Sequence, residues 1–312
     1  MTEAQKLTID KNGFEGSFYP SSNKEKTGVI VLSGDKDDDF LSRAFAKYFV
    51  KKGFDTLSLS LSQENKGTGV SLWKIEYSEK AVEFLKSQGI SKIAFCGISM
   101  QAVLALLSAS LIPEISMVIA FTPCDFVPWG FSHGKLLDDK NAEWPTGESL
   151  ASFRGEEIPC HPSPLPKIEY WEKFCQDKRQ YREMHSKGIF DLSERKRPVS
   201  EDAFIKIENI KGRIVLIGAG DDSMWDSRRY IERMKERLTR CGFSYPVDIF
   251  TPYVGTHLLL PQSLVKEAVP VFSTLVYMMF SSGRKFRGEC KKARLDLDIR
   301  LDKILNEFKE EK

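Results

Sequence analysis

The sequence has few cysteines and histidines, and their placement argues against several kinds of site. Its 312 residues include six cysteines and four histidines. The cysteines are scattered along the chain: Cys96, Cys124, Cys160, Cys175, Cys241 and Cys290. None of them forms a C-x-x-C pair, so the sequence predicts neither a zinc site nor a disulfide framework. We therefore expect free thiols, no metal and no cofactor.

The sequence also lacks a long hydrophobic run and an excess of charge of either sign. No apolar run reaches the roughly 18 residues that a membrane-spanning helix needs. The N-terminal stretch MTEAQKLTIDKNG has no apolar signal core. With 46 basic and 44 acidic residues, the net charge is +2, which gives no support for a nucleic-acid partner. We expect a cytoplasmic protein without membrane association, and the oligomeric state stays open.

Strand-like and helix-like segments alternate through much of the chain, after a first hairpin expected about Lys11-Asn12-Gly13. Strands are expected at 27–34, 54–61, 92–97, 115–123, 212–220 and 245–253, and helices at 38–52, 71–89, 100–111, 224–240 and 262–281. The strands are apolar nearly throughout, which is typical of a parallel sheet covered by helices on both faces.

The alternating pattern is interrupted once and ends before the C-terminus. Residues 124–200 are rich in Pro, Trp, Lys and Glu and hold several large aromatic residues, which favours an inserted cap. They include Trp129, Phe131, Trp144, Phe153, Tyr170, Trp171 and Phe174. The expected core is then 1–123 together with 201–283. Residues 284–312 form a highly charged tail, which we expect to be a surface helix or partly disordered.

Ser99 stands where an apolar strand meets an apolar helix. The segment Gly97-Ile98-Ser99-Met100-Gln101 nearly matches G-x-S-x-G, the strained strand-to-helix turn that exposes a nucleophilic serine. Gln101 replaces the final glycine. The alternative is that Ser99 simply caps the helix that follows it.

Downstream residues supply what a nucleophilic serine requires. A serine hydroxyl needs a histidine to take its proton, and the histidine needs a carboxylate to orient it. In α/β-hydrolases the order along the chain is serine, acid, histidine. Asp221 and Asp222 follow the next-to-last core strand, and His257 follows the last one. The two aspartates also suit an ordinary turn. The other histidines are expected to be surface or structural residues of the inserted segment: His133, His161 and His185.

An oxyanion hole is expected beside Ser99. Its donors are the backbone N–H of Met100 and one N–H from the loop after the first parallel strand, where Gly34 and Asp35 are the candidates. We expect the Asp35 side chain to point away from the oxyanion. Cys96, on the strand before Ser99, is expected to be a small buried hydrophobic residue rather than a reactive thiol.

Four segments resemble one known family. They are TGVIVLSG with LSRAFAKYFVKKGFDTLSLSL, WKIEYSEKAVEFLKSQGISKIAFCGISMQA, AFIKIENIKGRIVLIGAGDDSMWDSRRY, and YVGTHLLLPQ. Over residues 14–282 the chain is similar to the catalytic, C-terminal domain of the acyl-CoA thioesterase and bile acid-CoA:amino acid N-acyltransferase family. The Asp-Asp-x-x-Trp-x-Ser pattern in the third segment is the most specific part of the resemblance.

The resemblance implies an α/β-hydrolase fold, a mostly parallel central sheet with helices on both faces and an inserted cap. It implies that Ser99 is the nucleophile, Asp222 the acid and His257 the base. The transferase branch uses a cysteine nucleophile and the thioesterase branch a serine, so Ser99 favours hydrolysis. The sequence departs from the family at Gln101, in the loop Ser33-Gly34-Asp35-Lys36-Asp37 where relatives are glycine-rich, and in lacking the N-terminal β-sandwich domain of mammalian members.

The expected function is therefore hydrolysis of an acyl thioester or ester, with a small-molecule acyl ester or acyl-CoA as substrate. Two alternatives remain: a carboxylesterase or peptidase of the same fold, and a degenerate hydrolase that only binds a ligand. The aromatic residues of the cap either line an acyl pocket or form the cap's own core. Lys36, Arg228 and Arg229 either meet CoA phosphates or are solvated.

Overall fold

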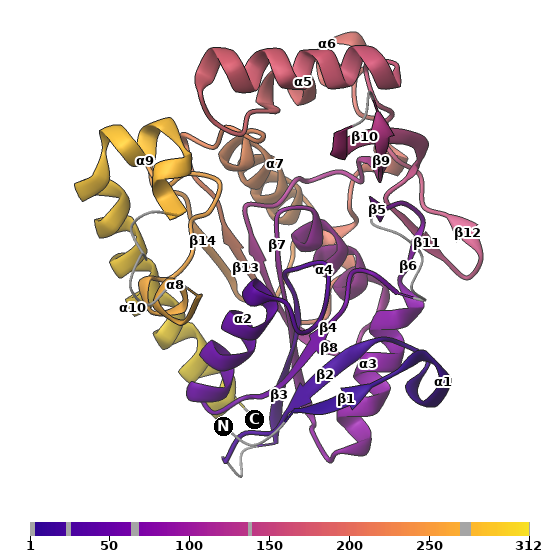
Figure 1. Cartoon of the computed structure of the whole chain (residues 1–312). Helices are drawn as coiled ribbons and strands as arrows, with labels where there is room; N and C mark the ends of the chain where they lie inside the picture. The colour runs from indigo at the N-terminus through magenta and orange to yellow at the C-terminus, as the bar shows by residue number, and fades with distance from the viewer. Residues whose placement is uncertain (1–3, 23–25, 64–68, 137–138, 269–275, 312) are drawn as a thin grey trace.

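A mixed sheet runs through the middle of the molecule (Figure 1). The computed structural model describes residues 4–22, 26–63, 69–136, 139–268 and 276–311. The sheet order is β1-β2-β4-β3-β7-β8-β13-β14. Its strands are β1 Gln5–Leu7, β2 Gly16–Tyr19, β3 Thr27–Leu32, β4 Asp55–Leu59, β7 Lys92–Ile98, β8 Ile115–Phe121, β13 Arg213–Ile217 and β14 Val247–Phe250.

The sheet is parallel from β4 to β14, as the sequence predicts. Only β1 and β2, at one edge, run antiparallel to their neighbours. They form the expected N-terminal hairpin, but its connection contains a short helix, α1 Ile9–Asn12. Gly13 ends that helix in the left-handed conformation, with φ 78°. Such a φ strains residues that carry a Cβ and therefore favours glycine here.

Helices cover both faces of the sheet because alternate side chains of each strand point in opposite directions. Val29 and Val31 of β3 pack in one core, and Ile30 and Leu32 pack in the other. The first core is closed by α2 Phe40–Lys51, α8 Gln262–Ala268 and α10 Arg287–Glu310. The second is closed by α3 Glu76–Ser87, α4 Met100–Leu111 and α7 Ser227–Arg240.

Residues 124–200, here called the inserted segment, lie between the adjacent strands β8 and β13. Sequence periodicity gave little sign of regular structure in this segment. The structure nevertheless contains β9 Trp129–Leu136, β10 Asp139–Ser149, β11 Ala151–Phe153, β12 Glu156–Glu157, α5 Lys167–Tyr181 and α6 Lys187–Lys196. Strand β9 also pairs with β5 Gly69–Val70, and β11 with β6 Trp73–Lys74. Figure 1 shows α5 and α6 as a layer beyond one end of the main sheet.

Two predicted helices differ from the structure. The helix expected at 71–89 begins only at Glu76, because the short strands β5 and β6 precede it. The prediction of one long helix at 262–281 is wrong. Helix α8 ends at Ala268, residues 269–275 lie outside the described residues, and a 3-10 turn at Val276–Met279 precedes α9 Ser281–Lys285. Pro270 was a sequence signal against a continuous helix, since proline disfavours helix interiors.

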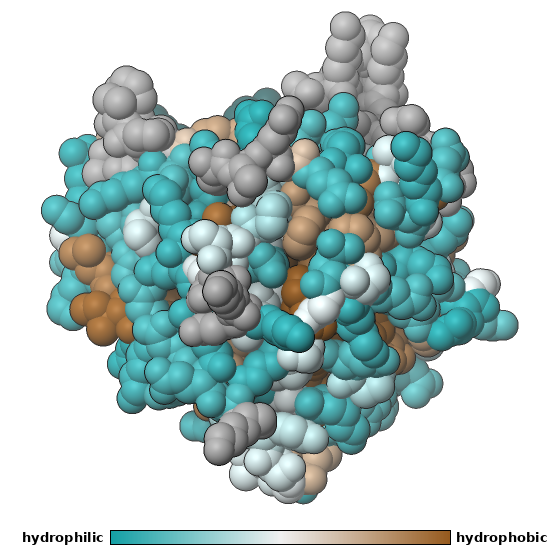
Figure 2. Space-filling model, turned by 90° about the horizontal axis from the view of Figure 1, so that it is seen from below, coloured by the Kyte–Doolittle hydropathy of each residue, from teal (hydrophilic) through white to brown (hydrophobic). Residues whose placement is uncertain are grey.

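The charged tail is helical and packs on the core. One side of α10 is buried and consists mainly of apolar residues: Cys290, Ala293, Arg294, Leu297, Leu301, Ile304, Leu305 and Phe308. Its charges lie largely on the other side, as in an amphipathic surface helix. Among the described residues, no helix is both long and apolar enough to cross a membrane. The face of the molecule opposite the inserted segment is mainly hydrophilic, with hydrophobic residues in scattered patches (Figure 2).

Candidate active site

Ser99 occupies a strained turn between β7 and α4. Its backbone φ is 60° and ψ is −128°, a region that residues other than glycine rarely adopt and that concentrates at functional sites. Gly97 makes the turn possible, since a Cβ there would stand 2.3 Å from the carbonyl oxygen of Gln101 and 2.8 Å from the nitrogen of Ala102. The N–H of Ser99 donates to the carbonyl of Phe121 on β8 at 2.9 Å. The turn is thus fixed on both sides.

The structure brings Ser99, Asp222 and His257 together from three loops. His257 Nε2 lies 2.9 Å from Ser99 Oγ, and His257 Nδ1 lies 2.9 Å from Asp222 Oδ1 and 3.0 Å from Oδ2. Asp222 and His257 are both buried. A carboxylate only accepts, so Nδ1 carries the ring proton and Nε2 is free to accept the serine proton. This is the hydrogen-bond order of a serine nucleophile, its general base and an orienting acid.

The candidate oxyanion residues Met100 and Asp35 line one cavity with Ser99. Met100 begins α4, so its N–H has no acceptor within the helix. On the opposite loop, Gly34 is held against Asp39, since a Cβ at Gly34 would stand 2.1 Å from Asp39 Oδ2. The carbonyl of Asp35 accepts from the N–H of Ser62 at 2.8 Å, which fixes the backbone of this loop. The Asp35 side chain is exposed, and its orientation away from an oxyanion stays a prediction.

Asp221 supports the histidine loop, a role that the sequence did not reveal. Its Oδ1 accepts from the N–H groups of Gly255 at 2.8 Å and Thr256 at 2.9 Å. Both of these residues are buried, and Thr256 has a positive φ of 66°. The two neighbouring aspartates therefore make different contacts. Asp222 contacts the His257 ring, and Asp221 binds the backbone N–H groups of the two residues that precede His257.

Trp225 is a second positioning residue. Its ring meets the His257 ring edge to face, with centroids 5.0 Å apart and planes at 87°. The indole N–H donates to the carbonyl of Thr122 at 3.1 Å, while the Thr122 hydroxyl donates to the carbonyl of His257 at 3.1 Å. Ser227 accepts from the N–H of Ala219 at 3.2 Å. The Asp-Asp-x-x-Trp-x-Ser pattern was therefore the available signal for these contacts.

A cavity of about 200 Å³ opens beside Ser99. Its walls are mostly apolar and come from both the core and the inserted segment: Leu61, Val70, Met100, Phe131, Tyr170, Phe174, Met184, Phe190, Met224 and Trp225. Polar residues at the cavity include Asp35, Gln101 and Ser186. An apolar cavity with a few polar groups is the usual form of a small-molecule site.

The aromatic residues of the inserted segment serve two purposes. Phe131, Tyr170 and Phe174 line the cavity beside Ser99. Trp129 is fully buried and stacks on Phe190, with ring centroids 5.1 Å apart. The two alternatives left open by the sequence therefore apply to different residues, since some aromatics form a pocket and others form a core beneath it.

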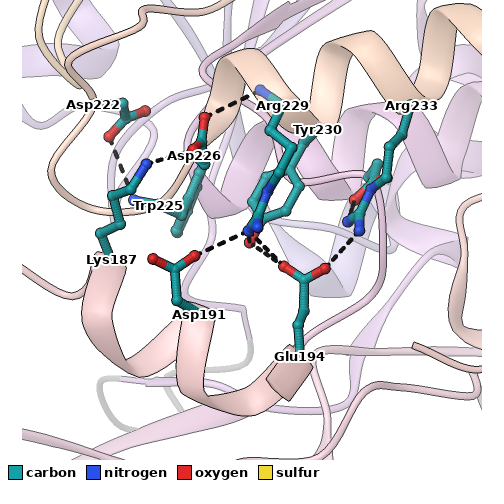
Figure 3. A network of polar contacts seen from close by, with 10 residues as sticks. Lys187, Asp191, Glu194, Asp222, Trp225, Asp226, Arg229, Tyr230 and Arg233 are labelled. Carbon is teal, nitrogen blue, oxygen red and sulfur yellow. Dashed lines mark hydrogen bonds and ion pairs between the residues drawn. The ribbon is translucent and has the colours of Figure 1, made fainter. Parts of the chain in front are cut away.

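Charged side chains join the inserted segment to the helix that follows Asp222 (Figure 3). Arg229 of α7 donates to Asp191 and Glu194 of α6, at 3.0 and 2.8 Å. Arg233, one turn further along α7, pairs with the same Glu194 and with buried Asp125 at 2.5 and 2.6 Å. Arg229 is thus engaged by carboxylates. Arg228 likewise pairs with Glu232 at 3.1 Å.

His161 and His185 are not part of the hydrogen-bonded set Ser99–His257–Asp222. His161 is buried against Phe126, and His185 stacks on Tyr181; burial lowers the pKa of both rings. His133 lies in β9, and its side chain is outside the described residues. Burial raises the pKa of the Cys96 thiol well above its usual value, which fits a small hydrophobic residue. Within the described ranges, no group of three or more His, Cys, Asp or Glu side chains is arranged to hold a metal.

The family model described as "BAAT / Acyl-CoA thioester hydrolase C terminal" matches residues 73–281, about two thirds of the chain. The chain belongs to this family. This member of the acyl-CoA thioester hydrolase family is a hydrolase with the α/β-hydrolase fold, as the resemblance implied. The matched range contains Ser99, Asp222 and His257 but not the oxyanion-loop candidates Gly34 and Asp35.

Solved structures similar to this family member include two bacterial or archaeal esterases. The Pyrococcus furiosus esterase Pf2001 is 16% identical, with 89% of this chain and 91% of that chain covered and a TM-score of 0.46. Esterase B from Lactobacillus rhamnosis is 13% identical, with coverages of 93% and 86% and a TM-score of 0.47. Likeness at this level says nothing about substrate. No curated protein sequence matches the chain.

Proposed function

We propose that the protein hydrolyses an acyl thioester or ester through Ser99, His257 and Asp222. The observation that supports this is the unbroken chain from Ser99 Oγ to His257 Nε2 and from His257 Nδ1 to the Asp222 carboxylate, at 2.9 Å for each link. Family membership favours the thioester, and acyl-CoA is the substrate we would test first.

The proposed reaction uses these contacts in turn. His257 takes the proton of Ser99 while Oγ bonds to the acyl carbon, and Asp222 stabilises the imidazolium. The N–H of Met100 and one N–H of the Gly34–Asp35 loop receive the negative charge on the carbonyl oxygen. When the carbon–sulfur or carbon–oxygen bond breaks, His257 returns the proton to the leaving thiolate or alkoxide. Water, deprotonated by His257, then attacks the acyl carbon. The bond to Ser99 Oγ breaks, His257 returns the proton to Oγ, and the acid leaves.

We further propose that residues 124–200 act as a cap on a hydrolase core formed by 1–123 and 201–283, with 284–312 as a C-terminal addition. The cap helices α5 and α6 contribute Tyr170, Phe174 and Phe190 to the cavity wall. Apolar walls suit the hydrocarbon part of an acyl group, because its burial removes apolar surface from water.

The decisive experiment is labelling with a fluorophosphonate probe, which reacts stably only with an activated serine. We expect labelling of the wild type and of Ser87→Ala, which alters an exposed serine of α3, and none of Ser99→Ala. Ser99→Ala should also lose hydrolysis while keeping the wild-type circular dichroism. Well-folded wild-type protein that takes no label would reject the proposal in favour of a ligand-binding protein.

The substrate class requires a separate assay. Acyl-CoA, p-nitrophenyl esters and aminoacyl p-nitroanilides would be compared at equal enzyme concentration. We expect the highest kcat/KM on a thioester. A preference for the anilide would instead assign the protein to the peptidases of this fold.

A further inference from the structure

The cavity beside Ser99 has polar side chains that the proposed mechanism does not use. Gln101 and Asp35 line this cavity together with Ser99. Among the described residues, neither the carboxamide of Gln101 nor the carboxylate of Asp35 has a hydrogen-bond partner. Ser186 differs, because its hydroxyl already donates to the carbonyl of Met224 at 2.6 Å. Gln101 and Asp35 therefore offer free hydrogen-bonding capacity at the cavity that Ser99 also lines.

The turn around Ser99 is tight even though Gln101 replaces the usual glycine. The contact that forbids a side chain at Gly97 is made by the backbone of Gln101 itself, at 2.3 Å from the ideal Cβ position. The start of α4 thus packs closely against the end of β7. The half-buried Gln101 takes part in the cavity wall, two residues beyond Ser99. A glycine at this position would leave that part of the wall without a polar group.

We propose that Gln101 is a specificity-determining residue that recognises a neutral hydroxyl group on the acyl chain, close to the reacting carbonyl. This inference rests on the proposed function. A carboxamide both donates and accepts, and so does a hydroxyl, so the two form a matched pair. The Asp35 carboxylate, which also lines this cavity, disfavours an anionic substituent.

A plain alkyl chain is the poorer ligand for this wall. It would displace water from the carboxamide without offering a hydrogen bond in return, and an unpaired polar group in an apolar cavity costs free energy. Sites built to hydrogen-bond a substrate hydroxyl therefore discriminate strongly against analogues that lack it. The remaining apolar wall accommodates the rest of the acyl group.

The test compares p-nitrophenyl 3-hydroxybutyrate with p-nitrophenyl butyrate. We expect the wild type to favour the hydroxy ester by about tenfold or more in kcat/KM. Gln101→Leu keeps similar bulk but cannot hydrogen-bond, so the ratio of the two kcat/KM values should fall to near one, whatever the absolute rate on the butyrate ester. A wild-type ratio near one, or an unchanged ratio in Gln101→Leu, would overturn the proposal.

A binding measurement separates this inference from the proposed function. Ser99→Ala protein, with and without Gln101→Leu, would be heated with 3-hydroxybutyramide or butyramide. The hydroxyamide should raise the Tm more than butyramide does, and only when Gln101 is present. Equal shifts with the two amides refute recognition by Gln101 whether or not the wild type hydrolyses esters. Absence of fluorophosphonate labelling, in contrast, counts only against the hydrolase mechanism.

Discussion

The division of work between Asp221 and Asp222 can be tested by replacing each in turn. Asp221→Ala removes the acceptor for the N–H groups of Gly255 and Thr256, both of which are buried. A buried donor left without a partner costs about 1–3 kcal/mol. Since a loop can relax in part, we expect the free energy of unfolding to fall by about 2–3 kcal/mol, measured by urea denaturation.

Activity should fall for the same reason. The two lost hydrogen bonds hold the backbone immediately before His257, and a displacement of about 1 Å in a catalytic group costs on the order of 10²-fold in rate. We therefore expect kcat/KM for a p-nitrophenyl ester to fall by about 10²-fold in Asp221→Ala. Asp221→Asn keeps an acceptor oxygen and should recover most of both losses.

Asp222 provides the contrast. Asp222→Asn keeps the shape of the side chain but removes the charge that fixes the His257 tautomer, so kcat should fall by about 10⁴-fold with little loss of stability. The reasoning is refuted if Asp221→Ala unfolds at the wild-type urea concentration and keeps kcat/KM within threefold. It is refuted equally if the two aspartates prove interchangeable in both measurements.

Two further predictions concern stability. Leu301→Ala, on the buried side of α10, should lower the free energy of unfolding in urea by about 2–5 kcal/mol. Ile299, on the same helix, is 72% exposed, so Ile299→Ala should change that free energy by less than about 0.5 kcal/mol. Equal effects of the two substitutions would show that α10 does not pack as described. Burial raises the pKa of Asp125 to about 6, above its unfolded value near 3.8, so the folded state binds a proton more tightly than the unfolded state does. The free energy of unfolding should therefore decline by up to about 3 kcal/mol as the pH rises from 4 to 7, measured relative to Asp125→Asn at each pH. The opposite slope would mean that the ion pair with Arg233 outweighs the effect of burial.

The hydrolase core could be predicted because its signals are local. Strands such as β3 and β7 are short apolar runs bounded by turn residues, and α4 is an apolar helix that begins directly after Ser99. The elements of the inserted segment could not be predicted in this way. Helix α5 has few buried residues, Tyr170 and Asp177, so its sequence carries only a weak apolar periodicity.

The tail shows a related difficulty. Its buried residues recur at helical spacing, but many charged residues lie between them. The high charge of the segment therefore hid its apolar side in the sequence. Which surface covers Leu297 and Leu301 depends on α2 and α8, which lie far away in sequence. Tertiary packing of this kind leaves no local sign beyond amphipathicity.

The candidate triad was visible in the sequence for a different reason. Serine, aspartate and histidine at the ends of successive parallel strands must meet at one edge of the sheet, and histidine is rare in this chain. The supporting contacts use backbone groups, such as the carbonyl of Thr122 and the N–H of Gly255. Backbone groups occur at every residue, so their use leaves no mark on composition or spacing.

The position of Asp222 depends on the inserted segment as well as on the sheet. The loop that carries Asp222 leads into α7, and Arg229 and Arg233 lie one turn apart on that helix. Both arginines pair with Glu194 of α6 (Figure 3). Helix α6 also supplies Phe190 to the cavity, where Phe190 packs on Trp225 with ring centroids 5.0 Å apart. Helix α6 is therefore in contact both with the helix that follows Asp222 and with the cavity beside Ser99.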